Sequence, residues 1–196
     1  SVELLDCLGS NKTVANAARV SFAVHTDEFR DKDKRLLRYL AKNNHWAPYA
    51  HVQLSLRLKA PLFVARQLVK HQVSLCWSEV SRRYVDFTPE FYAPEAWRKR
   101  APDKKQGSLD ETFEGRQEQR FDEKYWDLMT RCETVYNNMI SSGVAPEQAR
   151  MVLPQSMMTE WYWTGSLVAF ARVVTQRISE DAQYECRIVA EKIDQL

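Results

Sequence analysis

Residues 51–59, HVQLSLRLK, decide the fold that we expect of this chain. Apolar and polar residues alternate along the segment, and a period of two is typical of a β-strand with one buried and one exposed face. The apolar set is Val52, Leu54, Leu56 and Leu58. Such a strand suits an antiparallel sheet, because only one face of that sheet has to be covered by the core.

Helical patterns lie on both sides of this strand. Leucines at helical spacing predict a helix over 33–44, and the apolar stripe of 121–142 predicts a longer one. Pro61 ends the strand and can occupy the first turn of a helix over 62–72. A further, short helix is expected to begin at Pro146.

The run from about 156 to 193 is interpreted as two long helices that bury Trp161, Tyr162 and Trp163. The polar segment near 98–120 is expected to be an exposed connection or lid rather than a domain boundary. Together these patterns predict a single α+β domain over residues 1–196, helix-rich around a small, mainly antiparallel sheet.

The composition excludes several classes of protein. Of the 196 residues, 44% are hydrophobic and 28% charged, which is typical of a globular domain. The net charge of +2 is too small to favour a nucleic-acid partner. The cysteines lie far apart without metal-ligand spacing, so we expect reduced thiols and no metal site. No apolar run or signal-peptide pattern indicates a membrane or secretion, and a bacterial cytoplasm, or a host cytoplasm if the protein is viral, is expected.

Residues 70–84, KHQVSLCWSEVSRRY, combine an apolar run with a histidine, an acid and two arginines. Arginine's planar fork suits a phosphate or a polarised carbonyl, so the segment indicates a site for a phosphorylated, ring-bearing ligand. Structural alternatives remain open. Cations near Lys70 could offset the dipole of the preceding helix, and an extended segment over 79–87 could be an exposed edge strand with paired charges.

Arg150 and Arg177 lie in otherwise apolar helical segments, where a buried arginine is costly unless it is paired. A structural salt bridge to Glu160, Glu180 or Glu185 and a role in ligand binding both remain open for each of them.

Three separated blocks resemble the flavin-dependent thymidylate synthases in order and spacing. They are KAPLFVARQLVKHQVSLCWSEVSRRYVDFTPEFY, ARMVLP and TGSLVAFARVVTQRISEDAQYE, and the similarity extends from about Ala18 to Glu185. The family signature is Arg-His-Arg, seven residues and Ser, whereas here Lys70-His71-Gln72 is followed by eight residues and Ser81. Asp181 replaces a histidine found in many members. Lys70 and Gln72 in place of the two arginines predict weaker retention of the flavin, whereas Asp181 is expected to affect the folate or nicotinamide end of the site.

By position, the resemblance implies roles for individual residues. It implies that dUMP is bound by Gln67, Lys70, Glu79, Ser81, Arg82, Arg83, Arg150 and Arg177. It implies that FAD is contacted by His45, Lys70, His71, Gln72, Glu79, Ser166 and Arg172.

The reaction implied is reductive methylation of dUMP to dTMP, with methylenetetrahydrofolate as carbon donor, NADPH as reductant and FAD as hydride relay. Arg177 would be catalytic, because a fixed cation stabilises the enolate-like uracil whose C5 attacks the methylene carbon. No protein nucleophile attacks the uracil, so Cys76 is interpreted as a packing residue. The family also implies a homotetramer with shared active sites.

Two other functions are considered. A degenerate homologue would bind flavin or nucleotide without turnover, and the altered signature favours it. A single-stranded nucleic-acid binder would stack bases on Trp77, Tyr84 and Phe87, although the small net charge disfavours this.

Overall fold

The computed structural model describes residues 1–102 and 107–196. Its elements follow one another as β1 (Val2–Leu8), α1 (Asn11–Arg19), α2 (Asp31–Lys42), β2 (Gln53–Pro61), α3 (Leu62–Leu68), β3 (Leu75–Glu79), β4 (Arg98–Arg100), β5 (Ser108–Thr112), α4 (Arg116–Ser141), α5 (Pro146–Ala149), β6 (Met158–Ser166), α6 (Leu167–Arg177) and α7 (Tyr184–Asp194). Short 3-10 turns cover Val20–Phe22, Ala47–His51 and Arg150–Val152.

The central sheet has four strands in the order β1-β2-β6-β3, and each pair is antiparallel. The alternation that predicted β2 is confirmed. Leu56 lies opposite Trp163 and Leu58 opposite Trp161, and these side chains are at most 1% exposed. The apolar face of β2 therefore forms the centre of the core.

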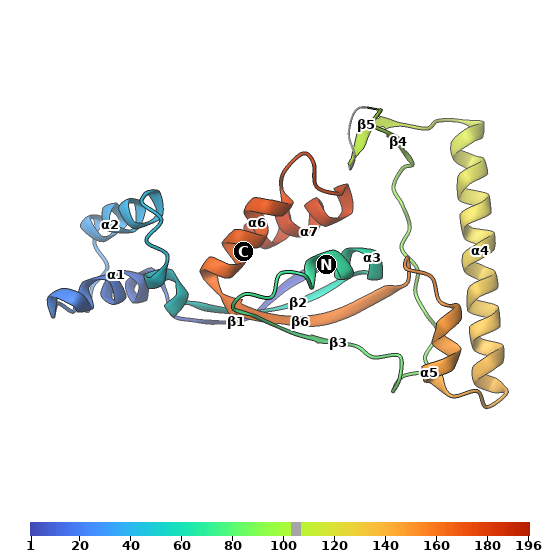
Figure 1. The fold of residues 1–196 in the computed structure, drawn as a ribbon, viewed down its shortest axis with the longest axis horizontal. Helices are drawn as coiled ribbons and strands as arrows, with labels where there is room; N and C mark the ends of the chain where they lie inside the picture. The colour runs from blue at the N-terminus through green and yellow to red at the C-terminus, as the bar shows by residue number, and fades with distance from the viewer. Residues whose placement is uncertain (103–106) are drawn as a thin grey trace.

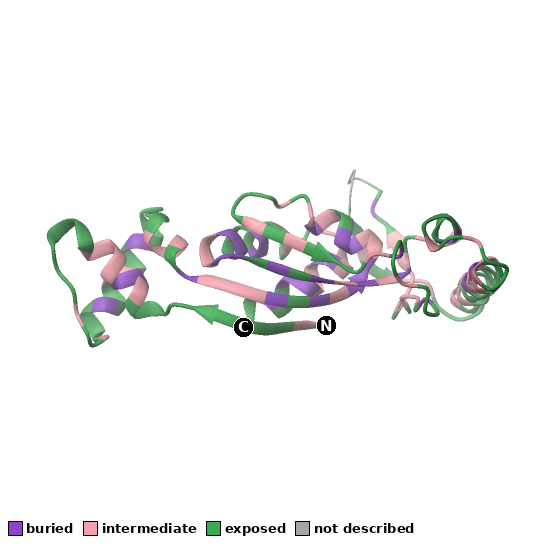
Figure 2. Ribbon diagram, turned by 90° about the horizontal axis from the view of Figure 1, so that it is seen from below, coloured by how far each residue is buried: buried purple, intermediate pink, exposed green. Residues whose placement is uncertain are grey.

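Helices α3, α6 and α7 cover the apolar face of this sheet (Figure 1). Phe170 on α6 and Leu68 on α3 are buried against the strand residues, and Trp77 on β3 stacks on Trp161 with ring centroids 4.5 Å apart. Buried residues concentrate in this central region, whereas most of α4 is exposed (Figure 2). The opposite face of the sheet carries polar pairs such as Ser55 with Thr164.

Two outlying units flank the sheet along the long axis of the molecule (Figure 1). At one end, α1 and α2 are joined by an ion pair between Arg19 and the fully buried Asp33. The backbone N–H of Arg30 also donates to Asp33 at 2.7 Å, and this bond, followed by the Arg19 contact, lowers the pKa of the carboxyl group. At the other end, α4 and α5 lie beside the strand ends.

One expectation for the secondary structure, the helix over 158–166, and one alternative, the edge strand over 79–87, are wrong. Residues 158–166 form strand β6 rather than helix, and Tyr162 is 52% exposed because it points to the polar face. The segment 79–87 is not an extended strand, since β3 ends at Glu79 and a turn follows. The backbone N–H of Tyr84 donates to the Ser81 carbonyl at 3.0 Å within this turn, and the buried Arg82 side chain donates to the Phe87 carbonyl. Helix α3 also ends at Leu68, earlier than predicted.

Within the predicted polar segment, β4 and β5 form a two-stranded sheet that precedes α4. An ion pair between Arg98 and Glu185 joins this small sheet to α7. Part of the connection, 103–106, lies outside the described residues. Across 1–102 and 107–196, none of the helices has the length and apolar character needed to cross a bilayer.

Candidate active site

Eight of the side chains expected to bind ligands line one of three pockets. The Arg177 pocket, of about 690 Å³, includes Gln67, Arg177, Asp181 and Gln183. The Glu79 pocket, of about 400 Å³, includes Glu79, Ser81, Arg82 and Arg150. The His45 pocket, of about 500 Å³, includes His45, Trp46, Tyr49 and Arg172. The His45 and Arg177 pockets share Gln176, and the Glu79 pocket has no residue in common with either of them.

The Arg177 pocket is built by α3, α6, the segment before α7 and the start of β5. Arg177 is the last residue of α6, where a cation is favoured by the helix dipole. Its Nε donates to Nε2 of His71 at 2.9 Å. Burial, followed by the charge of Arg177, lowers the pKa of His71. The amide of Gln67 donates to Gln183, which fixes a second polar side chain at this pocket.

In the Glu79 pocket, two donors hold the Glu79 carboxylate. Thr159 Oγ1 donates to one oxygen at 2.7 Å, and Trp77 Nε1 donates to the other at 3.1 Å. Thr159 is 7% exposed, so its hydroxyl is a fixed part of the β6 surface. The sequence reasoning missed Thr159, because β6 was expected to be a helix. The alternation of Thr159 with Trp161 and Trp163 is the signal that could have found it.

The arginines of this region have different surroundings. Arg82 is only 6% exposed, and its guanidinium carbon lies 4.2 Å from the centre of the Phe87 ring. Arg83 and Arg150 are exposed, and both meet Glu147. Arg83 Nε lies 3.7 Å from its carboxylate, and Arg150 Nε donates to its backbone carbonyl at 3.3 Å. Arg82 is therefore held inside the fold, whereas the other two guanidinium groups face solvent.

The salt bridges considered as one alternative for Arg150 and Arg177 are not among the described ion pairs. Glu160 pairs instead with Arg57 at 2.8 Å, and Glu185 pairs with Arg98. The ligand-binding alternative therefore remains for both arginines.

The His45 pocket lies between the end of α2, the turn Ala47–His51 and α6. Its walls are largely apolar or aromatic, and Arg172 supplies a cation whose Cζ lies 5.7 Å from the Trp46 ring centre. Tyr49 donates its hydroxyl to the Leu37 carbonyl at 2.7 Å, which fixes one wall. An aromatic pocket beside an exposed arginine suits a planar ligand that carries negative charge.

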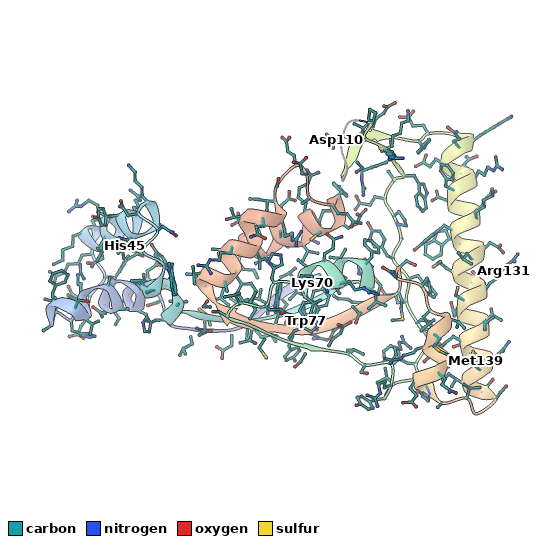
Figure 3. All side chains as sticks on the ribbon, in the orientation of Figure 1. His45, Lys70, Trp77, Asp110, Arg131 and Met139 are labelled. Atoms are coloured by element: carbon teal, nitrogen blue, oxygen red, sulfur yellow. The ribbon has the colours of Figure 1, made fainter. Side chains whose placement is uncertain are left out.

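Other predicted residues lie around these pockets. Lys70 and Gln72 are exposed in the turn after α3. Ser166 is 2% exposed, and its hydroxyl accepts from the backbone N–H of Ala169 as the N-cap of α6. Figure 3 shows His45 at the end formed by α1 and α2, whereas Lys70 and Trp77 lie at the central sheet. The interpretation of Cys76 as a packing residue is wrong for this chain, because its side chain is exposed.

The chain matches known proteins over its whole length. A family model described as "Thymidylate synthase complementing protein" matches residues 3–196. The flavin-dependent thymidylate synthase of Thermus thermophilus is 36% identical over 199 residues, which cover 100% of this chain and 70% of that protein. The chain belongs to the flavin-dependent thymidylate synthase family.

A second relative of this family, the flavin-dependent thymidylate synthase of Thermosipho melanesiensis, is 34% identical over 98% of this chain and 82% of its own length. Among solved structures, the UMP/dUMP methylase PolB of Streptomyces cacaoi, bound with 5-Br dUMP, superposes with a TM-score of 0.87. It is 28% identical, and the match covers 100% of this chain and 88% of PolB. The predicted family, enzyme class and helix-rich α+β fold are confirmed.

Proposed function

We propose that this chain catalyses the reductive methylation of dUMP to dTMP. Its membership of the flavin-dependent thymidylate synthase family and its likeness to a UMP/dUMP methylase support this substrate. The observation that carries the proposal is the Arg177 pocket. Gln67 and Arg177 lie 110 positions apart in the chain, and both line this polar pocket. A hydrogen-bonding amide and a held cation are the groups that a uracil ring requires for orientation and activation.

Arg177 is the catalytic residue of the proposed reaction. Uracil C5 is a poor nucleophile until electron density moves toward the C4 carbonyl and N3. A guanidinium fixed beside that edge stabilises the developing negative charge, so that C5 can attack the methylene carbon of methylenetetrahydrofolate. No side chain of the protein bonds to the uracil in this scheme, so Cys76 has no nucleophilic role.

The phosphate of dUMP requires cations and hydrogen-bond donors, and the Glu79 pocket offers them. Arg150 presents an exposed guanidinium group there, and Ser81 adds a hydroxyl. The exposed Arg83 does not line this pocket but meets Glu147, as Arg150 does. Glu79 is held by Thr159 and Trp77 and can accept from a ribose hydroxyl or a ring N–H. The Arg82 guanidinium donates to the Phe87 carbonyl and packs over the Phe87 ring, so we propose that its role is to fix the conformation of this loop.

The residues around the His45 pocket fit FAD, because aromatic walls suit a ring system and Arg172 offers a charge to the diphosphate. We assign His45 and Arg172 to this cofactor. Lys70, His71 and Gln72 would contact it from the turn after α3, and Ser166 would contribute through the start of α6. When bound, the flavin supplies hydride chemistry that the side chains lack, and NADPH serves as its reductant.

A homotetramer with shared active sites completes the proposal. The Arg177 and Glu79 pockets each contain part of the dUMP set, and a neighbouring copy of the chain would bring the two parts together. We place this enzyme in the cytoplasm, in keeping with four cysteines that are all free thiols.

The deciding experiment measures dTMP formed from dUMP with methylenetetrahydrofolate, NADPH and FAD, omitting each component in turn. We expect product that depends on all four. Arg177→Ala should lower kcat/KM by roughly 100-fold, because a preorganised electrostatic contact is lost. Arg30→Ala is the matched control, since Arg30 pairs with Glu28 at 2.9 Å on the exposed surface. Binding of FAD and dUMP without product would contradict the proposal and identify a homologue without turnover.

A further inference from the structure

The contact between His71 and Arg177 joins two segments that lie far apart in the sequence. His71 lies in the turn after α3, within the altered family signature Lys70-His71-Gln72. Arg177 ends α6, 106 positions later. The Nε–Nε2 distance of 2.9 Å is that of a normal N–H hydrogen bond. Both side chains are half-buried, so the bond forms at the edge of the Arg177 pocket rather than in open solvent.

The direction of this bond determines the protonation of the imidazole. A guanidinium has five N–H donors and no acceptor, so Nε2 of His71 must accept. A neutral imidazole has one protonated nitrogen, and the ring proton therefore lies on Nδ1. A doubly protonated imidazole could not make this contact, and its charge would repel the guanidinium.

The surroundings of the pair favour the neutral imidazole. Arg177 is the charge that acts on His71. The carboxylate that lines the same pocket as Arg177 is that of Asp181. On α7, burial raises the pKa of the Cys186 thiol, and the nearby positive charge of Arg177 acts on it in the opposite direction. Glu185, the other nearby acid on α7, is paired with Arg98. The exposed Lys70 precedes His71 and adds a further positive charge.

We infer that His71 is a positioning residue for Arg177, and that it acts as a neutral, Nδ1-protonated imidazole whose Nε2 fixes the orientation of the guanidinium. This inference rests on the proposed function, because it assigns the contact a purpose in orienting Arg177 toward the uracil. It also leaves the Nδ1–H of His71 as the one donor through which the ring can contact a second ligand. Protonation of His71 in acid breaks the contact and frees the guanidinium to turn.

The first test needs no substrate. The protein contains four histidines, so selective ¹⁵N-histidine labelling gives a simple NMR spectrum, and His71→Gln assigns the signals of His71. We expect the Nδ1–H tautomer in the wild-type protein and a rise in the His71 pKa in Arg177→Gln. An Nε2–H tautomer in the wild-type protein would overturn the inference, and so would a His71 titration unchanged by Arg177→Gln.

The second test separates positioning from simple packing. Gln at position 71 can present an amide oxygen near the place of Nε2 but does not titrate, whereas Leu fills the space without an acceptor. We expect His71→Leu to lower kcat/KM for dUMP by at least 10-fold and His71→Gln to recover most of that loss. We also expect His71→Gln to remove the decrease in kcat/KM at low pH that protonation of His71 causes. Flavin occupancy is measured for each variant, so that a loss of FAD is not counted as a loss of positioning.

The control variant is His25→Gln, because His25 is exposed and, among the ion pairs of the described residues, meets only the exposed Asp27 at 3.5 Å. It should change neither kcat/KM nor the pH profile. Equal losses in His71→Leu and His71→Gln would overturn the inference. An Nδ1–H tautomer together with an absence of dTMP would keep the contact and refute the proposed reaction, so the two failures are distinguishable.

Discussion

The hydroxyl group of Thr159 orients Glu79, a residue that we propose binds dUMP. It donates to Glu79 at 2.7 Å and is itself nearly buried, so the Glu79 carboxylate is oriented before any ligand arrives. Thr159→Val keeps the shape and removes the donor. A hydrogen bond to a charged group contributes about 1.5 kcal/mol, so we expect roughly 10-fold weaker binding of dUMP by isothermal titration calorimetry.

The same strand provides the control for this variant. Thr164 also lies on β6 but on the opposite face, where it is hydrogen-bonded to Ser55 at 2.9 Å. Thr164→Val should leave the affinity for dUMP unchanged. Equal losses in the two variants would mean that the effect comes from β6 as a whole, and the role assigned to Thr159 would be wrong.

Single residues of the site could be predicted only in part. The polar side chains of Arg177 and Gln67 indicated residues that could bind a polar ligand, and both side chains line one polar pocket. Their neighbours could not be predicted, because the contact of His71 with Arg177 depends on two segments that meet only in the folded chain. Arg82 resembled its neighbour Arg83 in the sequence, yet burial against Phe87 and Tyr136 separates their roles.

Among the elements, β6 is held against β3 by a close approach at Gly165. A Cβ atom at this position would lie 2.3 Å from the carbonyl oxygen of Ser74 and 3.2 Å from Cα of Leu75. Ser74 already has a positive φ of 60°, so the turn has little freedom to move away. We expect Gly165→Ala to destabilise the fold by about 2 kcal/mol, a typical cost of overpacking.

Calorimetry or circular dichroism should detect this as a decrease in Tm of roughly 4–8 °C for a chain of this length. Ser78→Ala is the comparison, because Ser78 is exposed on β3 opposite Tyr162. It should change Tm by no more than about 2 °C, as surface substitutions usually do. A Gly165→Ala protein with wild-type Tm would show that β3 can shift without cost.

Strand β2 was predictable because its polar face is regular, with Gln, Ser, Arg and Lys in alternation. Strand β6 was not predicted, because Trp161, Tyr162 and Trp163 are three consecutive aromatics and no proline or turn separates them from α6. Periodicity cannot separate a strand from a helix in such a run. Its place in the sheet is fixed by pairing with β2 and β3, which are non-local contacts.

At the scale of the whole molecule, the monomer leaves large apolar side chains exposed. Phe121, Leu128 and Val135 recur at seven-residue spacing along α4 and are 38%, 53% and 46% exposed. Exposed apolar stripes of this kind are typical of interfaces. The division of the dUMP set between two pockets agrees with this, since a second copy would both cover apolar surface and complete a site.

Mixed oligomers test whether the sites are shared. Arg177 lines one pocket and Arg150 another, so in the proposed homotetramer Arg177→Ala and Arg150→Ala should each greatly lower the activity of every site. After the two proteins are dissociated and reassembled together at equal amounts, some sites combine an intact Arg177 from one chain with an intact Arg150 from another. Random assembly gives about a quarter of all sites this composition, so we expect about that fraction of wild-type activity to return.

Reassembly of each variant alone is the control and should recover no activity. Sites built from a single chain would always contain one of the two substitutions, because each chain in the mixture carries either Arg177→Ala or Arg150→Ala. Mixing would then restore nothing, even in oligomers that demonstrably contain both chains. Recovered activity would therefore require that a pocket on one chain and a pocket on another act on the same dUMP molecule, and it would explain why none of the pockets formed by the described residues contains the whole set.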